Sequence, residues 1–394
     1  MRVLFFTYDF PFPTTSGGKT RAFNLLKYAG KNVELFLFSF TRESIDADRI
    51  EEVKKIGVKE QRLFQRKKLS DPSNVFALVN PKTSIFHSLY SDPRVSSELK
   101  DAIDEWKIDI VHFESFYTAF YLNKSYGVKQ IFGTENIEYR LYEEYAKYIA
   151  PIFLKPFYFW EARKIKSEEL GLYKAADASL AVLQDEAEYI KKISGKKSFV
   201  IPNGVDLSYF SYKQKKIHEK KKTILFIGNF SYFPNIDAVK FFYKNVFSCL
   251  ALEELEFLIA GKNAAGLQFL KNDKRVKTFD YFEDIRDAYY KSDIFVSPIR
   301  IGGGTNFKIL EAMACGVPVI AFPQRAQGIG AKDGKEILLA KDSNDFVKKI
   351  HKVFAEKDTA AALTRNARKL IEEKFSWDKI GATMNTVWHE VHNA

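Results

Sequence analysis

The sequence predicts an α/β protein with two doubly wound domains, each built on a parallel sheet. Its 394 residues are too many for one ordinary core, because a domain averages about 150 residues. Apolar strand-like runs alternate with amphipathic stretches, which is the pattern of βαβ units. A turn-rich motif, Ile-Pro-Asn-Gly-Val-Asp at 201–206, interrupts this alternation near the middle of the chain, and a lysine-rich run follows it.

The expected elements follow in the order that two such domains require. Before the break we expect strands at 2–6, 33–38, 109–113, 130–132, 179–183 and 199–201, with helices at 21–28, 96–106 and 162–175. After it we expect strands at 223–227, 256–260, 276–279, 294–297, 317–321 and 337–339, with helices at 236–246, 285–290, 307–314 and 346–353. Ligands of doubly wound sheets bind beyond the carboxyl ends of the strands, so we expect the site in a cleft between the domains.

Composition excludes several classes of protein. Hydrophobic residues make up 46% and charged residues 28%, as in globular proteins, which excludes disorder, collagen and coiled coil for most of the chain. No stretch approaches the roughly 20 apolar residues that span a bilayer, and no signal peptide is expected at the start. The two cysteines, Cys249 and Cys315, form no disulfide framework. We therefore expect a cytoplasmic location.

The net charge of +11 is unevenly distributed. Much of it lies in the lysine-rich run 213–222 and in residues 51–100, where ten Lys or Arg stand against six acids. Nucleic acid is not expected as a partner, because these basic residues are not interleaved with stacking aromatics along one face. An anionic membrane surface, a phosphorylated substrate and a solvated linker all remain open as interpretations.

The segment 301–321 carries the clearest chemistry. Three glycines, Gly302–Gly304, follow an expected strand and precede an expected helix, so that the backbone can approach a ligand and the first amides of the helix can bind an anion. Thr305 can cap the helix or donate to a phosphate. Lys308 can add a charge to a diphosphate, and Glu311, on the same helix face, can accept from a ribose diol.

The motif Gly-Gly-Gly-Thr-x-x-Lys-x-Leu-Glu-Ala-Met-Ala at 302–314 resembles that of the family 4 glycosyltransferases, in the branch that assembles bacterial polysaccharides. Further matching stretches occur in the family's order, at 5–18, 134–138, 201–206, 228–235 and 375–377. The resemblance implies a GT-B fold, in which two Rossmann-like domains face each other across a cleft. It also implies a retaining transfer of a hexose-type sugar from a nucleotide-diphosphate sugar, without a covalent enzyme intermediate, a metal or another cofactor.

The resemblance also implies a division of roles. The acceptor domain would be 1–205, the linker 206–222 and the donor domain 223–377, with a last helix at 378–394 packing back on the first domain. The implied catalytic residues are Lys308 and Glu135. The implied donor-binding residues are Gly17, Gly18, Asn229, Gly303, Gly304, Thr305, Asn306, Glu311 and Gln327. The implied acceptor-binding residues are Asn136 and Glu138.

Four departures from the family pattern stand out. Gly303 replaces the first of the family's two glutamates, and 229–235 lacks the usual Arg and Lys, which leaves Lys308 as the motif's cation. Glu135 replaces a histidine, and either holds an acceptor hydroxyl or acts as its base. Gln327 replaces a glutamate, and serves either as a sugar contact or as a plain loop residue.

The sequence leaves two interpretations open for a segment that could contact the acceptor. The aromatic segment 148–160, with basic residues beside it, is either an interfacial segment that reaches toward a lipid-linked acceptor at the inner face of the membrane, or a buried helix with its preceding loop. Asp46 and Asp48 form the chain's Asp-x-Asp, which a helix N-cap explains better than a cation site.

Two other functions remain open. One is a sugar- or nucleotide-binding protein that has lost catalysis, and the other is a sugar-nucleotide epimerase. A nicotinamide-dependent dehydrogenase is excluded, because the glycines at 328 and 330 lack the third glycine and the following helix that its fingerprint requires.

Overall fold

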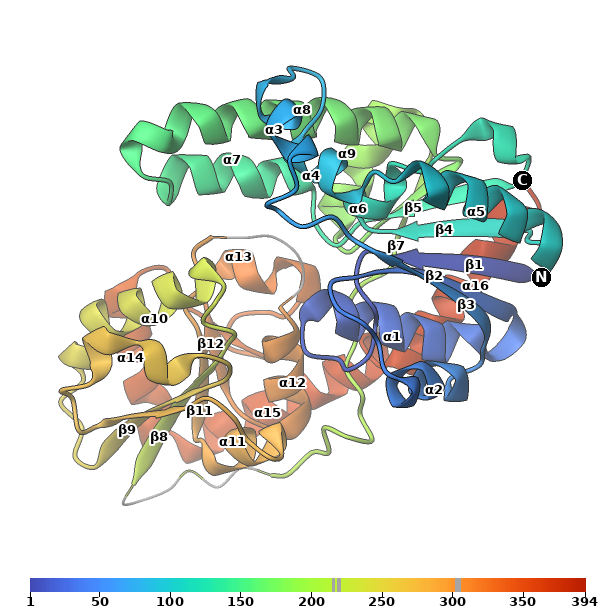
Figure 1. Ribbon diagram of the computed structural model, residues 1–394. Coiled ribbons are helices and arrows are strands. Elements are labelled where there is room, and N and C mark those ends of the chain that lie inside the picture. The colour runs from blue at the N-terminus through green and yellow to red at the C-terminus, as the bar shows by residue number, and fades with distance from the viewer. Residues whose placement is uncertain (215–216, 218–220, 302–305) are drawn as a thin grey trace. The chain divides into compact units, whose positions relative to one another are not determined.

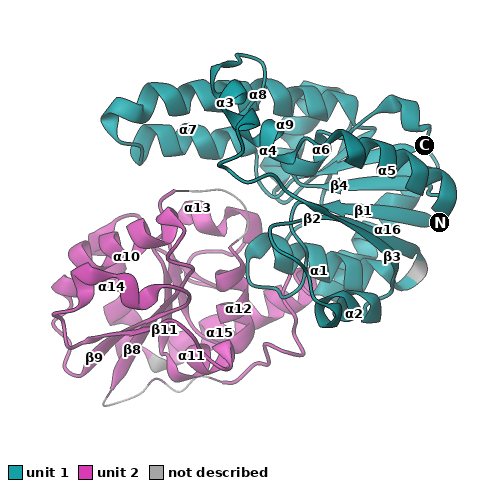
Figure 2. Ribbon diagram, viewed as in Figure 1, with its two compact units in different colours: residues 1–203, 377–394 teal, residues 204–376 magenta. Residues whose placement is uncertain are grey.

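The computed structural model describes residues 1–214, 217, 221–301 and 306–394. The chain forms two compact units (Figure 2): unit 1 is Met1–Asn203 with Trp377–Ala394, and unit 2 is Gly204–Ser376. Each unit contains a sheet of parallel strands with helices packed against it (Figure 1). The predicted class of two doubly wound α/β units is thereby confirmed. The predicted cleft between them stays a prediction.

Unit 1 contains a seven-stranded sheet in the order β3-β2-β1-β4-β5-β6-β7. The strands are β1 (Arg2–Thr7), β2 (Glu34–Thr41), β3 (Val58–Gln65), β4 (Ile110–Glu114), β5 (Lys129–Gly133), β6 (Ala178–Ala181) and β7 (Lys197–Val200). The helices are α1 (Gly17–Ala29), α2 (Ala47–Lys55), α3 (Ser73–Val79), α4 (Ile85–Tyr90), α5 (Pro93–Trp106), α6 (Phe116–Ala119), α7 (Glu138–Tyr148), α8 (Lys155–Ala175), α9 (Gln184–Ser194) and α16 (Trp377–His392). Strand order reverses between β1 and β4, which is where such sheets bind ligands.

The central strands of unit 1 are apolar because both faces of the sheet are covered. Leu4 and Phe6 of β1 pack into a core with α5, α8 and α9. Phe5 points to the opposite face, where its ring lies 6.5 Å from that of Trp388 in α16. α1 and α16 lie on this second face (Figure 1).

The contact between α16 and α1 is close. Gly381 of α16 lies against the backbone of Tyr28, and a Cβ at this glycine would come within 2.6 Å of the Tyr28 carbonyl carbon. Trp388, one of the largest fully buried side chains of the described residues, fills the space beneath β1 and β4. A segment that follows unit 2 in sequence therefore forms part of the core of unit 1.

Unit 2 contains a six-stranded sheet in the order β10-β9-β8-β11-β12-β13. The strands are β8 (Lys222–Ile227), β9 (Leu255–Ala260), β10 (Val276–Phe279), β11 (Ile294–Ser297), β12 (Val319–Ala321) and β13 (Leu338–Leu339). The helices are α10 (Phe233–Asn245), α11 (Ile285–Lys291), α12 (Phe307–Cys315), α13 (Pro323–Ala326), α14 (Ser343–Ala355) and α15 (Lys357–Lys374). Here the strand order reverses between β8 and β11.

The chain enters and leaves unit 2 at adjacent points. Val205 pairs with Ser376 in an isolated bridge, and its amide donates to the Phe375 carbonyl (2.8 Å). Residues 206–214, the first part of the segment we assigned to the linker, pack on unit 2, where the Lys213 amide donates to the Cys315 carbonyl. Within the described part of the chain, none of the helices combines the length and apolar character that crossing a bilayer requires.

Candidate functional site

Unit 1 places Gly18 and Glu135 together at its switch point. Gly18 lies in the first turn of α1, which Ser16 caps, and Glu135 follows β5. A Cβ on Gly18 would lie 2.1 Å from the Tyr8 hydroxyl and 2.8 Å from Oε1 of Glu135. Glycine is therefore needed here because the side chains of Tyr8 and Glu135 occupy that space. Gly17, one residue earlier, is exposed.

The carboxyl of Glu135 is held in a state that favours proton exchange near neutral pH. Burial, and then the negative charge of Glu114, raise its pKa to about 7, and Arg21 acts in the opposite direction. Its Oε1 has no hydrogen-bond partner among the described residues. A half-buried carboxyl whose Oε1 is unpaired, at the carboxyl edge of a sheet, is suited to receive a hydroxyl group of a ligand.

A buried ionic network lies beneath this edge. Nε of Arg21 in α1 donates to Oε1 of Glu114 at the end of β4 (2.6 Å), and its Nη1 donates to Oδ1 of Asn203 (3.0 Å). Oε2 of Glu114 lies 2.8 Å from His112, whose Nδ1 accepts from the Trp388 indole (3.3 Å). Burial would raise the pKa of Glu114, but Arg21 and His112 lower it to about 2. Glu114 is therefore a fixed negative charge near Glu135.

The other two predicted acceptor residues have different surroundings. The Tyr117 hydroxyl donates to Oε1 of Glu138 (2.5 Å), and burial raises the pKa of Glu138 to about 7. The rings of Tyr8 and Tyr117 are 5.3 Å apart, so Glu138 borders the same aromatic pair as Glu135. Oδ1 of Asn136 is buried and has no partner among the described residues.

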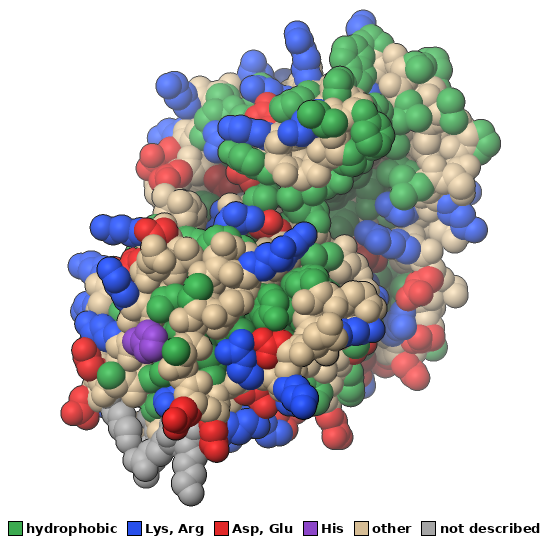
Figure 3. Space-filling model, turned by 90° about the vertical axis from the view of Figure 1, so that its left-hand side faces the viewer, with side chains coloured by type: hydrophobic (Ala, Val, Ile, Leu, Met, Phe, Trp, Pro, Cys, Tyr) green, Lys and Arg blue, Asp and Glu red, His purple; other side chains and the backbone are tan. Residues whose placement is uncertain are grey.

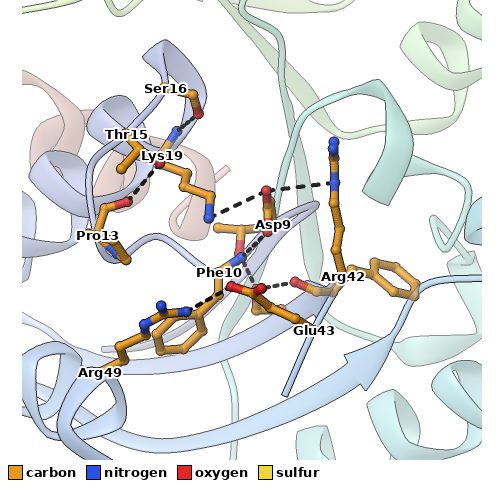
Figure 4. Close-up of polar contacts among 12 residues, drawn as sticks. Asp9, Phe10, Pro13, Thr15, Ser16, Lys19, Arg42, Glu43 and Arg49 are labelled. Carbon is orange, nitrogen blue, oxygen red and sulfur yellow. Dashed lines mark hydrogen bonds and ion pairs between the residues drawn. The ribbon is translucent and has the colours of Figure 1, made fainter. Parts of the chain in front are cut away.

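Figure 4 shows charged side chains around the start of α1 that the motifs did not single out. Lys19, next to Gly18, reaches Asp9 (3.5 Å), and Arg42, just after β2, approaches the same carboxylate (3.9 Å). Lys19 follows directly after the glycines in the sequence, which is the signal that could have identified it. Asp46 accepts from the Arg49 amide and caps α2, as the N-cap interpretation of the Asp-x-Asp predicted.

Unit 2 brings Lys308 and Asn229 together through Asn235, to which the motifs assigned no role. Nζ of Lys308 donates to Oδ1 of Asn235 (2.8 Å), and Nδ2 of Asn235 donates to the Asn229 carbonyl (2.8 Å). The ammonium also lies 5.4 Å from the centre of the Phe226 ring. Its burial lowers the pKa of Lys308 to about 8. The amide of Asn235 thus ties the loop after β8 to α12.

The remaining donor residues are placed as follows. Oδ1 of Asn306 accepts from the Lys308 amide and caps α12, while its Nδ2 donates to Ser297 at the end of β11. Burial raises the pKa of Glu311, whose Oε2 accepts from the buried Tyr289 hydroxyl (2.6 Å). Gln327 is exposed beyond β12. The predicted residues Gly303, Gly304 and Thr305 lie outside the described residues.

Two family models match the chain: "Glycosyltransferase Family 4" over residues 15–209 and "Glycosyl transferases group 1" over residues 221–356. The chain belongs to glycosyltransferase family 4. The first model covers residues 15–203 of unit 1 and the first six residues of unit 2, and the second begins one residue before β8. The sites at the two switch points therefore lie in the two modules of a glycosyltransferase.

Two relatives are similar to the chain, and one of them is named a glycosyltransferase. The glycosyltransferase is 22% identical to a 44.6 kDa protein in the cps region of Klebsiella pneumoniae, over 96% of this chain and 97% of that protein. A glycosyltransferase of Methanocaldococcus jannaschii is 24% identical over 53% of this chain and 57% of its own length.

Solved structures show the same fold. A sucrose-phosphate synthase from Thermosynechococcus elongatus superposes with a TM-score of 0.73 at 15% identity, over 99% of both chains. Anabaena HepE in complex with UDP-glucose gives a TM-score of 0.66 at 14% identity, over 99% of this chain and 100% of that one. The glycosyltransferase therefore has the GT-B fold.

Proposed function

We propose that this glycosyltransferase moves a hexose-type sugar, with retention and without a metal, from a nucleotide-diphosphate sugar to a glycan or lipid-linked acceptor in the assembly of cell-surface polysaccharide. One observation carries the proposal: the ammonium of the half-buried Lys308 donates to the neutral side-chain amide of Asn235 at the carboxyl edge of unit 2. An ammonium whose hydrogen-bond partner is neutral is stabilised by an anionic ligand, and a diphosphate is such a ligand.

Each of the other residues has a role that follows from its surroundings. Glu311, oriented by Tyr289, accepts from the ribose diol of the nucleotide. Asn229 and Asn235 shape the loop beside the diphosphate. Lys308 stabilises the charge that develops on the leaving nucleoside diphosphate as the bond between the anomeric carbon and the phosphate oxygen breaks.

In unit 1, Glu135 binds the acceptor hydroxyl. With a pKa of about 7, its carboxylate accepts a hydrogen bond from that hydroxyl and can take up its proton as the new glycosidic bond forms. Asn136 and Glu138 bind other groups of the acceptor. The wider role in polysaccharide assembly draws support from the resemblance of the 302–314 motif and from the relative in the cps region. For the location we propose the cytoplasm, at the inner face of the membrane.

A thermal-shift screen tests the donor site. Purified protein is heated with GDP, UDP, ADP, TDP and their sugar conjugates, because a ligand that binds the native state raises the melting temperature by mass action. We expect one nucleotide diphosphate to raise it by several degrees, and the Lys308→Ala variant to lose the shift. Lys244→Ala, at an exposed lysine of α10, is the matched control. A shift that Lys308→Ala retains would remove Lys308 from the site.

Product analysis then tests the reaction. With the bound sugar nucleotide and a glycan or lipid-linked acceptor, we expect nucleoside diphosphate release that depends on the acceptor, and an anomeric configuration in the product that matches the donor. Conversion of the sugar nucleotide without an acceptor would instead support an epimerase. Binding without turnover for any acceptor class would support the non-catalytic alternative.

A further inference from the structure

Unit 1 exposes its large hydrophobic side chains in two segments only. Among the described residues of this unit, every exposed large hydrophobic lies within 69–79 or 148–160. The first segment contains α3, where Phe76 is 70% exposed and Val79 73% exposed. The second contains the 3-10 helix Ile152–Leu154 and the start of α8, with Ile152 at 83% and Phe153 at 77%.

Helix α3 buries small or polar side chains and exposes large apolar ones, which is the reverse of an ordinary surface helix. Its polar Asn74 is buried, and its Nδ2 donates to the carbonyls of Lys68 (2.9 Å) and Leu69 (3.1 Å). The small Ala77 is also buried, while Phe76 and Val79 point outward. A surface helix normally buries its large apolar residues. The exposed face of α3 is therefore suited to contact an apolar partner.

The two segments belong to one surface, because α3 and α8 are tied together. Nζ of Lys164 in α8 donates to the Ala77 carbonyl of α3 (2.8 Å), and Lys164 also pairs with Glu161. Trp160, 41% exposed, precedes this contact by one helical turn. Figure 1 shows α3 beside α8, and in Figure 3 hydrophobic side chains gather over the upper part of the face shown, with Lys and Arg among them.

The exposed charged side chains next to these segments are basic, whereas the nearby Glu143 and Glu144 are half-buried and Glu161 pairs with Lys164. Lys68, Lys82, Lys147 and Arg163 are exposed next to the apolar side chains, and Asp71 is half-buried. We call the exposed apolar residues of 69–79 and 148–160, with these four basic residues, the apolar–basic surface. Pairing it with a second copy of itself would bring like charges together, which opposes association. An apolar layer covered by negative charges is the better match.

We propose that the apolar–basic surface docks on an anionic phospholipid bilayer, with Phe76, Val79, Ile152 and Phe153 entering the acyl boundary and the basic residues contacting the lipid headgroups. The sequence segment 148–160 is therefore interfacial rather than buried. This inference does not rest on the proposed function, because it uses no residue of the candidate site.

Vesicle sedimentation tests the proposal directly. The full chain should pellet with vesicles of phosphatidylcholine and phosphatidylglycerol, less with phosphatidylcholine alone, and less at higher salt. The double variant Phe76→Ser, Val79→Ser should weaken binding at least about tenfold, because two apolar side chains leave the acyl boundary. Lys82→Glu with Arg163→Glu should weaken it by about tenfold or more.

Matched controls lie in unit 2. Tyr281 is 78% exposed, so Tyr281→Ser with Phe269→Ser makes the same kind of change at residues that do not belong to the apolar–basic surface. Lys271→Glu with Lys274→Glu changes charge equally at exposed positions. Both controls should bind as the wild type does. Equal weakening by the control and test variants would overturn the proposal, as would a wild type that does not pellet with either vesicle.

A quenching measurement adds a readout whose wild-type arm does not depend on how any variant folds. Fluorescence of Trp160 should be quenched by phospholipids with brominated acyl chains, and Trp160→Phe should lose the quenching while still binding. No quenching in the wild type would contradict the proposal. The proposal would also be contradicted if the wild type did not bind vesicles but formed a dimer, and if Phe76→Ser with Val79→Ser dissociated that dimer. The surface would then bind a second copy of the chain.

Discussion

Replacing Lys308 by methionine tests whether its positive charge destabilises the folded protein in the absence of an anionic ligand. Burial lowers the pKa of Lys308 from 10.5 to about 8, which means that the charge opposes folding near pH 7 by at most about 3.4 kcal/mol. Methionine keeps the alkyl chain and removes the charge. Its cost is the hydrogen bond to Asn235, about 1–2 kcal/mol. We therefore expect the variant to be up to about 2 kcal/mol more stable at pH 7, and unable to bind a nucleoside diphosphate.

The pH dependence separates this explanation from ordinary repacking. The pKa of Lys308 in the folded chain lies below its value in the unfolded chain, so between about pH 8 and 10.5 only the unfolded chain keeps the proton. The penalty is complete below pH 8 and disappears as the pH rises through this window. The stability of the wild type relative to Lys308→Met should therefore increase by up to about 3 kcal/mol between pH 7 and 10.

Urea unfolding followed by circular dichroism at the two pH values measures this difference. The exposed Lys244→Met substitution in α10 serves as the control and should leave the difference between wild type and variant unchanged with pH. The reasoning is refuted if the Lys308→Met difference is the same at both pH values, or if the variant loses several kcal/mol at pH 7. Lys308 would then be an ordinary structural lysine.

Three further predictions concern unit 1. Turnover should rise with pH around a midpoint of about 7, because burial and the charge of Glu114 raise the pKa of Glu135 to that value. The initial rate of Glu135→Gln should be about 10² lower and should not vary with pH across that range. A variant that keeps the pH profile of the wild type would exclude Glu135 as the base. Gly18→Ala should lower turnover at least about tenfold, because its Cβ would lie 2.1 Å from the Tyr8 hydroxyl and displace Glu135. Gly171→Ala, inside α8 with nothing within 4 Å of the new Cβ, should raise stability in urea by about 0.5–1 kcal/mol and leave turnover unchanged; a loss of stability would show that the helix does not accept the methyl group.

Most of the sheet could be predicted from apolar runs, because central parallel strands are buried on both faces. Strand β3 could not, since its sequence Val-Lys-Glu-Gln-Arg-Leu-Phe-Gln is that of an edge strand that is half open to water. Residues 152–160 were harder for a different reason. Their apolar pattern indicates either a core or an interface, and the structure shows them exposed.

The candidate site was predictable where a motif names the residue, and not where the partner comes from another element. Lys308 and Glu311 could be found from their spacing on one helix. Asn235 and Tyr289, which hold them, lie on α10 and α11 and have no fixed spacing from α12. The same holds for Tyr8 and Gly18, whose proximity depends on how the chain turns back after β1.

The position of α16 in the core of unit 1 has a consequence for biosynthesis. On the ribosome, residues 1–203 emerge long before Trp388, and making residues 204–376 takes on the order of 10 to 35 s at ordinary translation rates. During that time the nascent first unit exposes the apolar face of α1 and β1 that α16 later covers. Unit 2 has no such wait, because its own strands and helices are contiguous in sequence. Unit 2, although it is translated second, can therefore finish folding first. Unit 1 is the part of the nascent chain that chaperones have to protect.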